Sequence, residues 1–407
     1  MKIRGFFLTF SVFLSASVFF LSCKDNKTVS SIEEKEVFKL QYGNFEDQLN
    51  LFDLRNVGGI NTSLVMRDGF FYILNGEARK IMQMNSFGDL MTFYYNPEFN
   101  ASPSYASGQD IKEATRKAVE YAFNDLSYIT VDSRKYLYVV DKLPLDRQEQ
   151  DNKKKLVLSQ IVLRFDSNGK FLDYIGQQGP GGTPFPYIKG VYTNKANELI
   201  VVSYSSEGYY IYWFSTDGYL LYQVPVMAGT VPNPFHAEEK DTFSNVTAII
   251  PDYNSRVLYL DIDYYANHID ESSRLQSGVD YLSSRVYSLD VESGTYGDPV
   301  EILPNSEQVT EGFSNEHYEI PYDFLGVTES GWLFFIVNTD SGFDLEIIQG
   351  DGQRILRRKL TCDRKKLLYY SFDLSDTGIL SALLVNDENA RVVWWRTDSL
   401  IQSVVNK

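Results

Sequence analysis

Cysteine and histidine are scarce in this chain of 407 residues, which contains two cysteines and three histidines. Two cysteines cannot build the disulfide framework that stabilises many small secreted domains. His236, His268 and His317 show no spacing such as His-x-x-x-His, so each is interpreted as a loop residue rather than a metal ligand. We therefore predict no metal-binding residue and no cofactor.

Catalytic motifs and extended basic surfaces are also missing. The sequence has no Gly-x-Ser-x-Gly elbow, and Gly179–Gly182 lacks the Gly-Lys-Ser/Thr ending of a phosphate-binding loop. No catalytic residue is assigned. The net charge of −16 argues against binding nucleic acid and against direct docking on anionic lipid, because both need a basic patch. Three short basic runs, at 153–155, 357–359 and 364–366, are interpreted as solvated loops or edge strands.

What the N-terminus does contain is the pattern of an export signal. Lys2 and Arg4 precede an almost uninterrupted apolar stretch over residues 5–21, which ends at Ser22 and Cys23. A short basic start, an apolar stretch of about 15 residues and a small residue before the cleavage point define a secretory signal. A spanning helix usually needs about 20 apolar residues, so the stretch falls slightly short. An uncleaved anchor helix remains the alternative.

Cys23 is the predicted lipidation site. Leu21, Ser22 and Cys23, followed by polar residues 24–31, resemble a bacterial lipobox, in which the cysteine thiol accepts a diacylglyceryl group. The resemblance implies a lipoprotein of the bacterial cell envelope, most simply on the outer membrane. Each buried CH₂ of an acyl chain contributes about 0.8 kcal/mol, so two or more chains anchor a protein durably. Cys362 then has no partner, and we predict no intramolecular disulfide.

The rest of the chain repeats one pattern of four apolar runs and polar turns. The clearest copy has apolar runs at 127–132, 136–141, 160–166 and 171–176, with a Ser-Asn-Gly turn at 167–169. The other copies begin near residues 64, 190, 247, 325 and 368. Asn-Gly and Asp-Gly turns favour tight hairpins because both residues tolerate positive φ. The runs are rich in β-branched and aromatic residues, which indicates strands.

Six copies of a four-stranded unit predict an all-β fold, a six-bladed β-propeller with four-stranded antiparallel blades. We assign residues 1–22 to the signal peptide, 23–50 to the lipidated tether and first segment, and 51–407 to the propeller. Two β-sandwiches are the alternative, although sandwiches do not require the same strand order six times. One insertion has helical spacing, with Ile111, Ala114 and Ala118 on one stripe, which predicts a helix near 109–124.

A family resemblance rests on residues 165–188. This segment runs from Phe165 through Asp-Ser-Asn-Gly to a Gly/Pro-rich link and Ile188, and it resembles the connection between blades in NHL-like six-bladed propellers. Such propellers are common among bacterial surface and periplasmic lipoproteins. Related six-bladed hydrolases bind an axial Ca²⁺ through Glu, Asn and Asp from several blades. The resemblance implies that Asp132, Asp141, Asp261 or Asp263 would contribute if they lie near the blade tops.

The predicted function is therefore binding rather than catalysis. We expect a membrane-anchored extracytoplasmic lipoprotein whose propeller is a binding scaffold for a protein or a small molecule, with no nucleic acid as partner. An axial Ca²⁺-dependent hydrolase or lactonase, and a factor that helps to assemble the envelope or outer membrane, are the alternatives. The sequence assigns no ligand-binding residue, and the fold alone does not decide among these functions.

Overall fold

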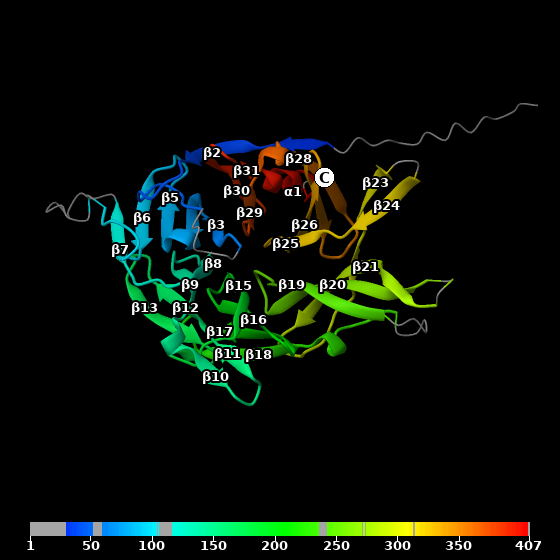
Figure 1. Ribbon diagram of the computed structural model, residues 1–407, viewed down its shortest axis with the longest axis horizontal. Helices are drawn as coiled ribbons and strands as arrows, with labels where there is room; N and C mark the ends of the chain where they lie inside the picture. Colours follow the sequence, from blue (N-terminus) through cyan, green and yellow to red (C-terminus); the bar gives the residue numbers. More distant parts are fainter. Residues whose placement is uncertain are drawn as a thin grey trace, which may run out of the picture.

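The computed structural model describes residues 30–51, 59–103, 105, 116–235, 242–270, 272, 274–311 and 314–405. The predicted signal peptide and Cys23 lie outside the described residues. Within these ranges six sheets follow one another around a central axis (Figure 1), so the chain forms the predicted six-bladed β-propeller. No helix of the described ranges is long and apolar enough to cross a membrane.

The first three blades are consecutive in the chain, and the innermost strand of each comes first. Blade 1 contains β3 (Thr62–Arg67), β4 (Phe70–Asn75), β5 (Lys80–Met84), β6 (Leu90–Tyr95) and β7 (Lys117–Glu120). Blade 2 contains β8 (Leu126–Val131), β9 (Leu137–Lys142), β12 (Gln160–Phe165), β13 (Phe171–Gly176) and β14 (Gly179–Pro180). Blade 3 contains β15 (Tyr187–Thr193), β16 (Leu199–Ser205), β17 (Gly208–Phe214) and β18 (Leu220–Val226).

The last three blades repeat this order, and two of them add a strand from the N-terminus. Blade 4 contains β19 (Thr242–Pro251), β20 (Val257–Ile269), β21 (Gln276–Asp290) and β22 (Val300–Ile302). Blade 5 contains β25 (Asp323–Val327), β26 (Trp332–Thr339), β27 (Gly342–Gln349), β28 (Ile355–Thr361) and β1 (Ser31–Glu33). Blade 6 contains β29 (Tyr369–Leu374), β30 (Leu380–Val385), β31 (Ala390–Trp395) and β2 (Lys35–Leu40).

The core consists of hydrophobic clusters between the blades. Six clusters of described residues fill the six interfaces between neighbouring blades. On β26, Phe334 packs toward blade 6 and Phe335 toward blade 4, so six consecutive residues of this strand are buried. Strands covered on both faces read as continuous apolar runs, which explains why the apolar runs of the sequence mark the blades so clearly.

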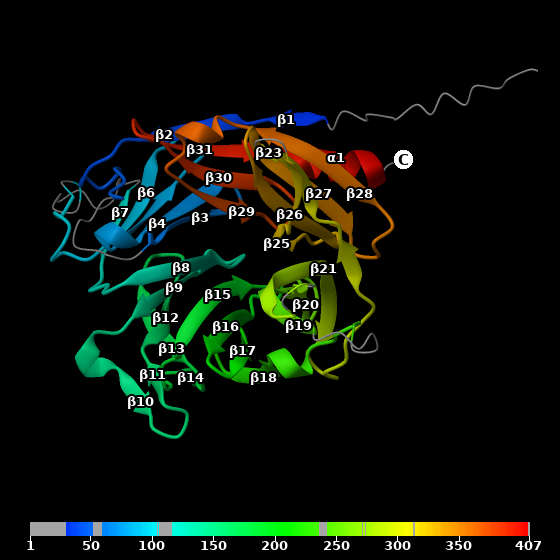
Figure 2. The same cartoon turned by 45° about the vertical axis from the view of Figure 1, so that its right-hand side comes forward.

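The ring closes through the N-terminal segment, which corrects the predicted boundary at residue 51. β2 pairs antiparallel with β31 as the outer strand of blade 6, and β1 pairs parallel with β28 of blade 5. Figures 1 and 2 show both strands along the outer edge of the ring. Residues 31–40, assigned above to the tether segment, therefore belong to the propeller. Pairing between the two ends of the chain satisfies edge groups that would otherwise stay open.

The C-terminal residues form a helix instead of the expected last strand of blade 6. α1 (Thr397–Val405) begins directly after β31, and β2 already occupies the outer position in that blade. Leu400, Ile401 and Val404 recur at helical spacing and pack on the cluster between blades 5 and 6. The repeat copy that begins near residue 368 was predicted to supply four strands, and it supplies three. The fourth position is taken by β2, more than 350 positions away in the sequence.

The predicted helix near 109–124 is not found in the part that the structure describes. Residues 106–115 lie outside the described residues, whereas Lys117–Glu120 form β7, which pairs parallel with β6. Ala118 packs against the cluster between blades 6 and 1, and Val119 against the cluster between blades 1 and 2. The open edge of β6 supplies hydrogen-bonding partners that outweigh the weak helical spacing of this segment.

Three hairpins extend beyond the ring. β10 (Glu149–Asp151) and β11 (Leu156–Leu158) form a small sheet, β20 and β21 continue past blade 4, and β23 (Asn305–Glu311) pairs with β24 (Ser314–Ile320) between blades 4 and 5. Figure 1 shows them projecting from the rim. Short 3-10 helices occupy connections at Gly76–Ala78, Leu145–Arg147, Ala228–Thr230 and Arg364–Lys366.

Candidate functional site

A cavity of about 370 Å³ lies on the axis of the ring. The innermost strand of every blade contributes to its wall, namely β3, β8, β15, β19, β25 and β29. Much of the wall is apolar, with Leu64, Val191 and Val327 among the lining residues. Cavities of roughly 300–1,000 Å³ with a few convergent polar groups are typical of small-molecule sites. The axis is therefore the first place to look for a ligand.

Polar side chains from three blades meet at one end of this cavity. Arg67, at the end of β3, forms an ion pair with Asp376, which follows β29, with Nη1 and Oδ2 3.0 Å apart. The Nη2 of Arg67 donates to the hydroxyl of Tyr253 at 3.1 Å. Because Tyr253 belongs to blade 4, opposite blade 1 in the ring, the guanidinium reaches across the axis. Arg67, Tyr253 and Asp376 therefore form one end of the cavity, called here the polar end, with the positive charge of Arg67 held in a fixed position.

Charges around Arg67 stabilise its protonated form. Burial disfavours the charged guanidinium of Arg67, but the carboxylate of Asp376 and the hydroxyl of Tyr253 stabilise it more strongly. The pKa of Arg67 is therefore raised. Nε of Arg67 is buried and has no hydrogen-bond partner among the described residues. A buried N–H without a partner costs about 1–3 kcal/mol, and a bound acceptor would remove that cost.

Asp373 supplies a titratable carboxyl to the same end. Its Oδ2 accepts a hydrogen bond from the backbone N–H of Met66 at 2.8 Å. The carboxyl borders the cavity, and Asp373 is half-buried. Burial raises the pKa of Asp373 to about 7, against the opposing effects of the Met66 N–H and Arg67. Near neutral pH this group can both donate and accept hydrogen bonds, which suits a polar ligand.

The polar end is held by the turns that follow the innermost strands, called here the inner turns (residues 68–69, 132–136, 194–198, 252–256, 328–331 and 375–379). In four of them a side chain at the first position accepts a hydrogen bond from a backbone N–H four residues later, with Asp132, Asn194, Thr328 and Ser375 as acceptors. The fourth residue of each of these four turns has a left-handed backbone conformation. Lys135 and Asn197 have φ values of 67° and 58°, and the other two turns have Gly331 and Gly378 at this position. This local pattern gives the inner turns a common shape.

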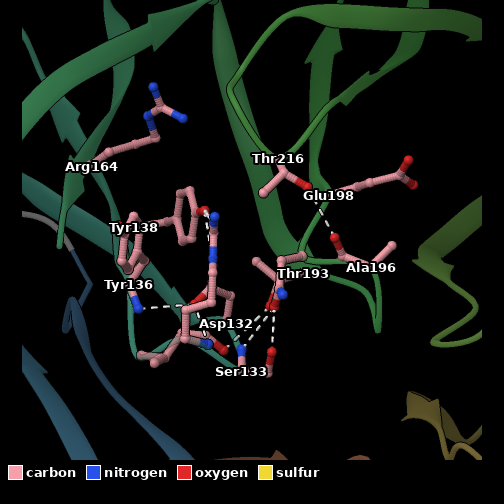
Figure 3. Close-up of polar contacts among 12 residues, drawn as sticks. Asp132, Ser133, Tyr136, Tyr138, Arg164, Thr193, Ala196, Glu198 and Thr216 are labelled. Atoms are coloured by element: carbon pink, nitrogen blue, oxygen red, sulfur yellow. Dashed lines mark hydrogen bonds and ion pairs between the residues drawn. The ribbon is translucent and has the colours of Figure 1, made fainter. Parts of the chain in front are cut away.

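Neighbouring inner turns contact one another around the whole ring. The six links are Lys135 with Asp68, Ser133 with Asn197, Lys195 with Tyr253, Asn254 with Glu329, Glu329 with Asp376, and Asp376 with Arg67. Figure 3 shows the link between blades 2 and 3, where Ser133 lies beside the turn that contains Ala196 and Glu198. The ring of turns fixes the positions of Arg67, Tyr253 and Asp376 relative to one another.

Asp132 and Asp141, two of the residues implied by the resemblance, lie at opposite ends of β9 and do not meet. Asp132 accepts hydrogen bonds from Arg134 Nε at 2.8 Å and Nη2 at 2.6 Å. Asp141 accepts the backbone N–H groups of Asn124 and Asp125, and burial raises its pKa to about 6. Both carboxylates stabilise turns and connections of blade 2, and neither lines the axial cavity.

Asp261 and Asp263 do share one face of β20, as their alternation predicts. They lie between blades 4 and 5, where Asp323 is a further carboxylate near both. Thr247 donates to Asp261 at 2.9 Å, and Ser284 and Tyr265 donate to Asp263. Burial, followed by the charge of Asp263, raises the pKa of Asp261 to about 8. The pair is part of a blade interface and not of the axial cavity.

The residues at the axis do not fit the Ca²⁺ of the hydrolase alternative. Asp373 and Asp376 offer carboxylates, but the Arg67 guanidinium pairs with Asp376 and its charge also acts on Asp373. A divalent cation there would stand beside a fixed positive charge. In the ranges that the structure describes, no group of three or more His, Cys, Asp and Glu side chains could hold a metal ion.

Cys362 does not line the cavity. Cys362 lies half-buried after β28, and burial raises the pKa of its thiol to about 11, so little thiolate forms at neutral pH. Of the histidines, His268 lies on β20 with Nδ1 3.0 Å from Asp280. His236 lies outside the described residues, and His317 lies on β24, so the expectation of a loop residue was wrong for His268 and His317.

Sequence analysis missed Arg67, Tyr253, Asp373 and Asp376. Each lies at or just after the end of the first strand of its repeat copy. That common position was the available signal, because the first strands of propeller blades surround the axis. Aligning the six copies by strand order would have placed these four residues at one end of the same channel.

Comparisons with known proteins give a fold likeness only. No protein-family model and no curated protein matches the chain. Among solved structures, it is similar to a gluconolactonase from Xanthomonas campestris, with TM-score 0.43 and 10% identity over 90% of this chain and 96% of that chain. It is also similar to regucalcin, a calcium-binding protein from Agrobacterium tumefaciens, with TM-score 0.38 and 10% identity over 91% and 96%. The polysaccharide lyase Uly1 gives TM-score 0.42 and 7% identity over 90% and 99%.

Proposed function

We propose that this protein is a lipid-anchored protein of the bacterial cell envelope whose propeller binds a small polar molecule in the axial cavity. The observation that carries the proposal is the cavity of about 370 Å³, which all six blades line and which ends in Arg67, Tyr253, Asp373 and Asp376. The anchor is the lipidated Cys23 of the sequence prediction, and the resemblance to NHL-like lipoproteins supports the same location.

The shape of the site indicates the chemistry of the ligand. Arg67 and Tyr253 offer donors, and Asp373 offers a carboxyl with a pKa of about 7. The apolar wall formed by residues such as Leu64 and Val327 contacts carbon atoms. A ligand with an oxygen-rich end and a less polar body, such as a small hydroxy acid or a monosaccharide derivative, satisfies both parts of the cavity.

Binding is tested with the full-length lipidated protein in detergent. Native mass spectrometry of protein purified from envelopes reports a co-purifying small molecule, and thermal shifts against hydroxy acids and sugars report added ones. We expect Arg67→Met and Asp373→Asn to lose the bound mass and the shifts, while Asp217→Asn, in an exposed turn, keeps them. A wild type that binds nothing, or variants that bind as the wild type does, would refute the axial site.

The anchor and the hydrolase alternative are tested in the same preparation. Replacing Cys23 by Ser should move the protein from the membrane fraction to the soluble fraction and abolish labelling by radioactive palmitate. Lactone hydrolysis that requires Ca²⁺, together with a rise in Tm on adding Ca²⁺, would favour the enzyme over the binding protein. These measurements are independent, because anchoring and axial binding use different residues.

A protein partner is a second candidate, and the extended β20–β21 hairpin favours it. Ile269, Leu275 and Val279 on this hairpin are 53%, 67% and 52% exposed, although they are large and apolar. Exposed apolar patches on a projecting element are typical of protein contacts. Crosslinking in intact envelopes should capture the same partner with the wild type and lose it with Ile269→Ser/Val279→Ser. An unchanged crosslinking pattern would contradict this role, including a role in envelope assembly.

A further inference from the structure

Two of the basic runs in the sequence meet at the outer edge of blade 5. Arg357, Arg358 and Lys359 lie on β28, and the 3-10 helix Arg364–Lys366 follows almost at once. Residues 353–366 contain seven basic side chains and one acidic side chain, in a chain with a net charge of −16. We call the seven basic side chains of this segment the basic edge: Arg354, Arg357, Arg358, Lys359, Arg364, Lys365 and Lys366.

Part of this positive charge is offset within the protein, where Lys359 lies opposite Asp344 on β27 and its charge acts on that carboxyl. Arg357 pairs with the buried Glu346 at 2.6 Å, and Lys366 pairs with Asp363 at 2.8 Å. The other five form no ion pair with another residue of the described ranges. Lys359 and Lys365 are exposed to solvent. The basic edge is therefore available to an anionic partner, and it differs in sign from the protein as a whole.

The N-terminal chain enters the propeller at the basic edge. β1 pairs in parallel with β28, with Ser31 opposite Lys359, and the backbone N–H of Lys359 donates to the carbonyl oxygen of Ser30 at 3.2 Å. Only residues 24–29 separate Ser30 from Cys23. Seven steps of extended chain span at most about 25 Å, so a lipid on Cys23 keeps the bilayer surface within that distance of Lys359.

We propose that the basic edge contacts anionic lipid headgroups next to the anchor and fixes the orientation of the propeller on the membrane. This inference rests on the lipid anchor of the proposed function. The tether lets the edge approach within a Debye length of about 10 Å, where opposite charges attract. The acidic remainder of the protein is repelled from the same surface. The outer rim at blade 5 then faces the bilayer, and both flat faces of the ring stay in solvent.

Lysine footprinting on lipidated full-length protein tests the orientation. The protein is placed in vesicles of phosphatidylcholine alone or with about 30% phosphatidylglycerol, and an amine-reactive reagent labels exposed lysines for mass spectrometry. Lys153, Lys154 and Lys155, in the hairpin between β10 and β11, provide an internal control, because they form the third basic run and lie on an insertion between β9 and β12 of blade 2. We expect labelling of Lys359 and Lys365 to slow at least threefold with the anionic lipid, and labelling of the control lysines to change less than 1.5-fold.

A charge-reversal variant completes the test. Arg358→Glu/Lys365→Glu should abolish the slowing at Lys359, while Lys153→Glu/Lys154→Glu should retain it. Equal labelling of Lys359 in the two vesicle types overturns the proposal, and so does equal slowing of the control lysines. Flotation of the protein with both vesicle types reports the anchor separately, so a protein that fails to float refutes the lipidation of Cys23 and not the basic edge.

Discussion

The buried carboxyl of Asp261 makes the stability of this propeller depend on pH. An unfolded aspartate has a pKa near 3.9, whereas the folded value is about 8 because burial and Asp263 disfavour the charged form. Between these pH values the folded protein holds a proton that the unfolded chain has lost. The contribution of Asp261 to the free energy of unfolding is therefore largest at acidic pH. It falls as the pH rises and is lost above the folded pKa.

The size of the effect follows from the same linkage. A difference of one proton gives a slope of about 1.4 kcal/mol per pH unit. From pH 5 to pH 8 the upper limit is about 4 kcal/mol, and relaxation of the blade interface and entry of water reduce it to about 2 kcal/mol. The contributions of Asp141 and Asp373 end lower, near their pKa values of about 6 and about 7. Between pH 7 and pH 8 Asp261 is still titrating, but Lys80, whose pKa burial lowers to about 8, contributes a slope of the opposite sign, so only the difference between the wild type and an Asp261 variant isolates Asp261.

Urea unfolding followed by tryptophan fluorescence measures this slope. Asp261→Asn keeps the shape of the side chain and an acceptor for Thr247, but it has no proton to lose. We expect this variant to be about 2 kcal/mol more stable than the wild type at pH 8, and we expect the difference between the two proteins to grow from pH 7 to pH 8. Asp217→Asn, in an exposed turn, should follow the wild type. A variant with the wild-type slope above pH 7 would refute the reasoning.

Three further perturbations test the ring. Arg67→Met leaves Asp376 without its cation and should cost about 2–3 kcal/mol in urea unfolding; Arg67→Met/Asp376→Asn should recover part of that loss, and no recovery would contradict the pair. Leu40 on the closing strand β2 is 2% exposed, so Leu40→Ala should lower the free energy of unfolding by about 2–4 kcal/mol. Phe45 is 69% exposed, so Phe45→Ala should change it by less than about 0.5 kcal/mol. Equal effects of the two substitutions would argue against closure of the ring by β2. Trp213→Phe removes the indole N–H that donates to the buried Glu198 at 2.7 Å. The control is Trp394→Phe, because the indole N–H of Trp394 has no partner among the described residues. In the same assay Trp213→Phe should lower the free energy of unfolding by about 1–3 kcal/mol more than the control does.

Local signals made much of the fold predictable. The run at 136–141 became β9 because strands buried on both faces need unbroken apolar sequence. The turn at Asn168-Gly169 formed as expected, with Gly169 at a φ of 82°. Asp261 and Asp263 share a face because side chains alternate along a strand. In each case the physical cause lies within a few residues of the signal.

Long-range pairing decided what the local pattern could not. β2 replaced the expected last strand because the two ends of the chain meet only after the ring has formed. β7 formed where helical spacing pointed to a helix, because the edge of β6 offered backbone partners. The polar end of the cavity joins Arg67, Tyr253 and Asp376 from three blades, and nothing in their sequence spacing links them.

By itself, the amino-acid sequence determined that the chain has six similar β-sheet modules, because each module carries its own apolar runs and turn residues. Only the tertiary structure decided which side chains share the axis, which strand closes the ring and which basic runs share an edge. Those contacts join residues up to hundreds of positions apart, and their energies depend on a geometry that exists only in the closed ring.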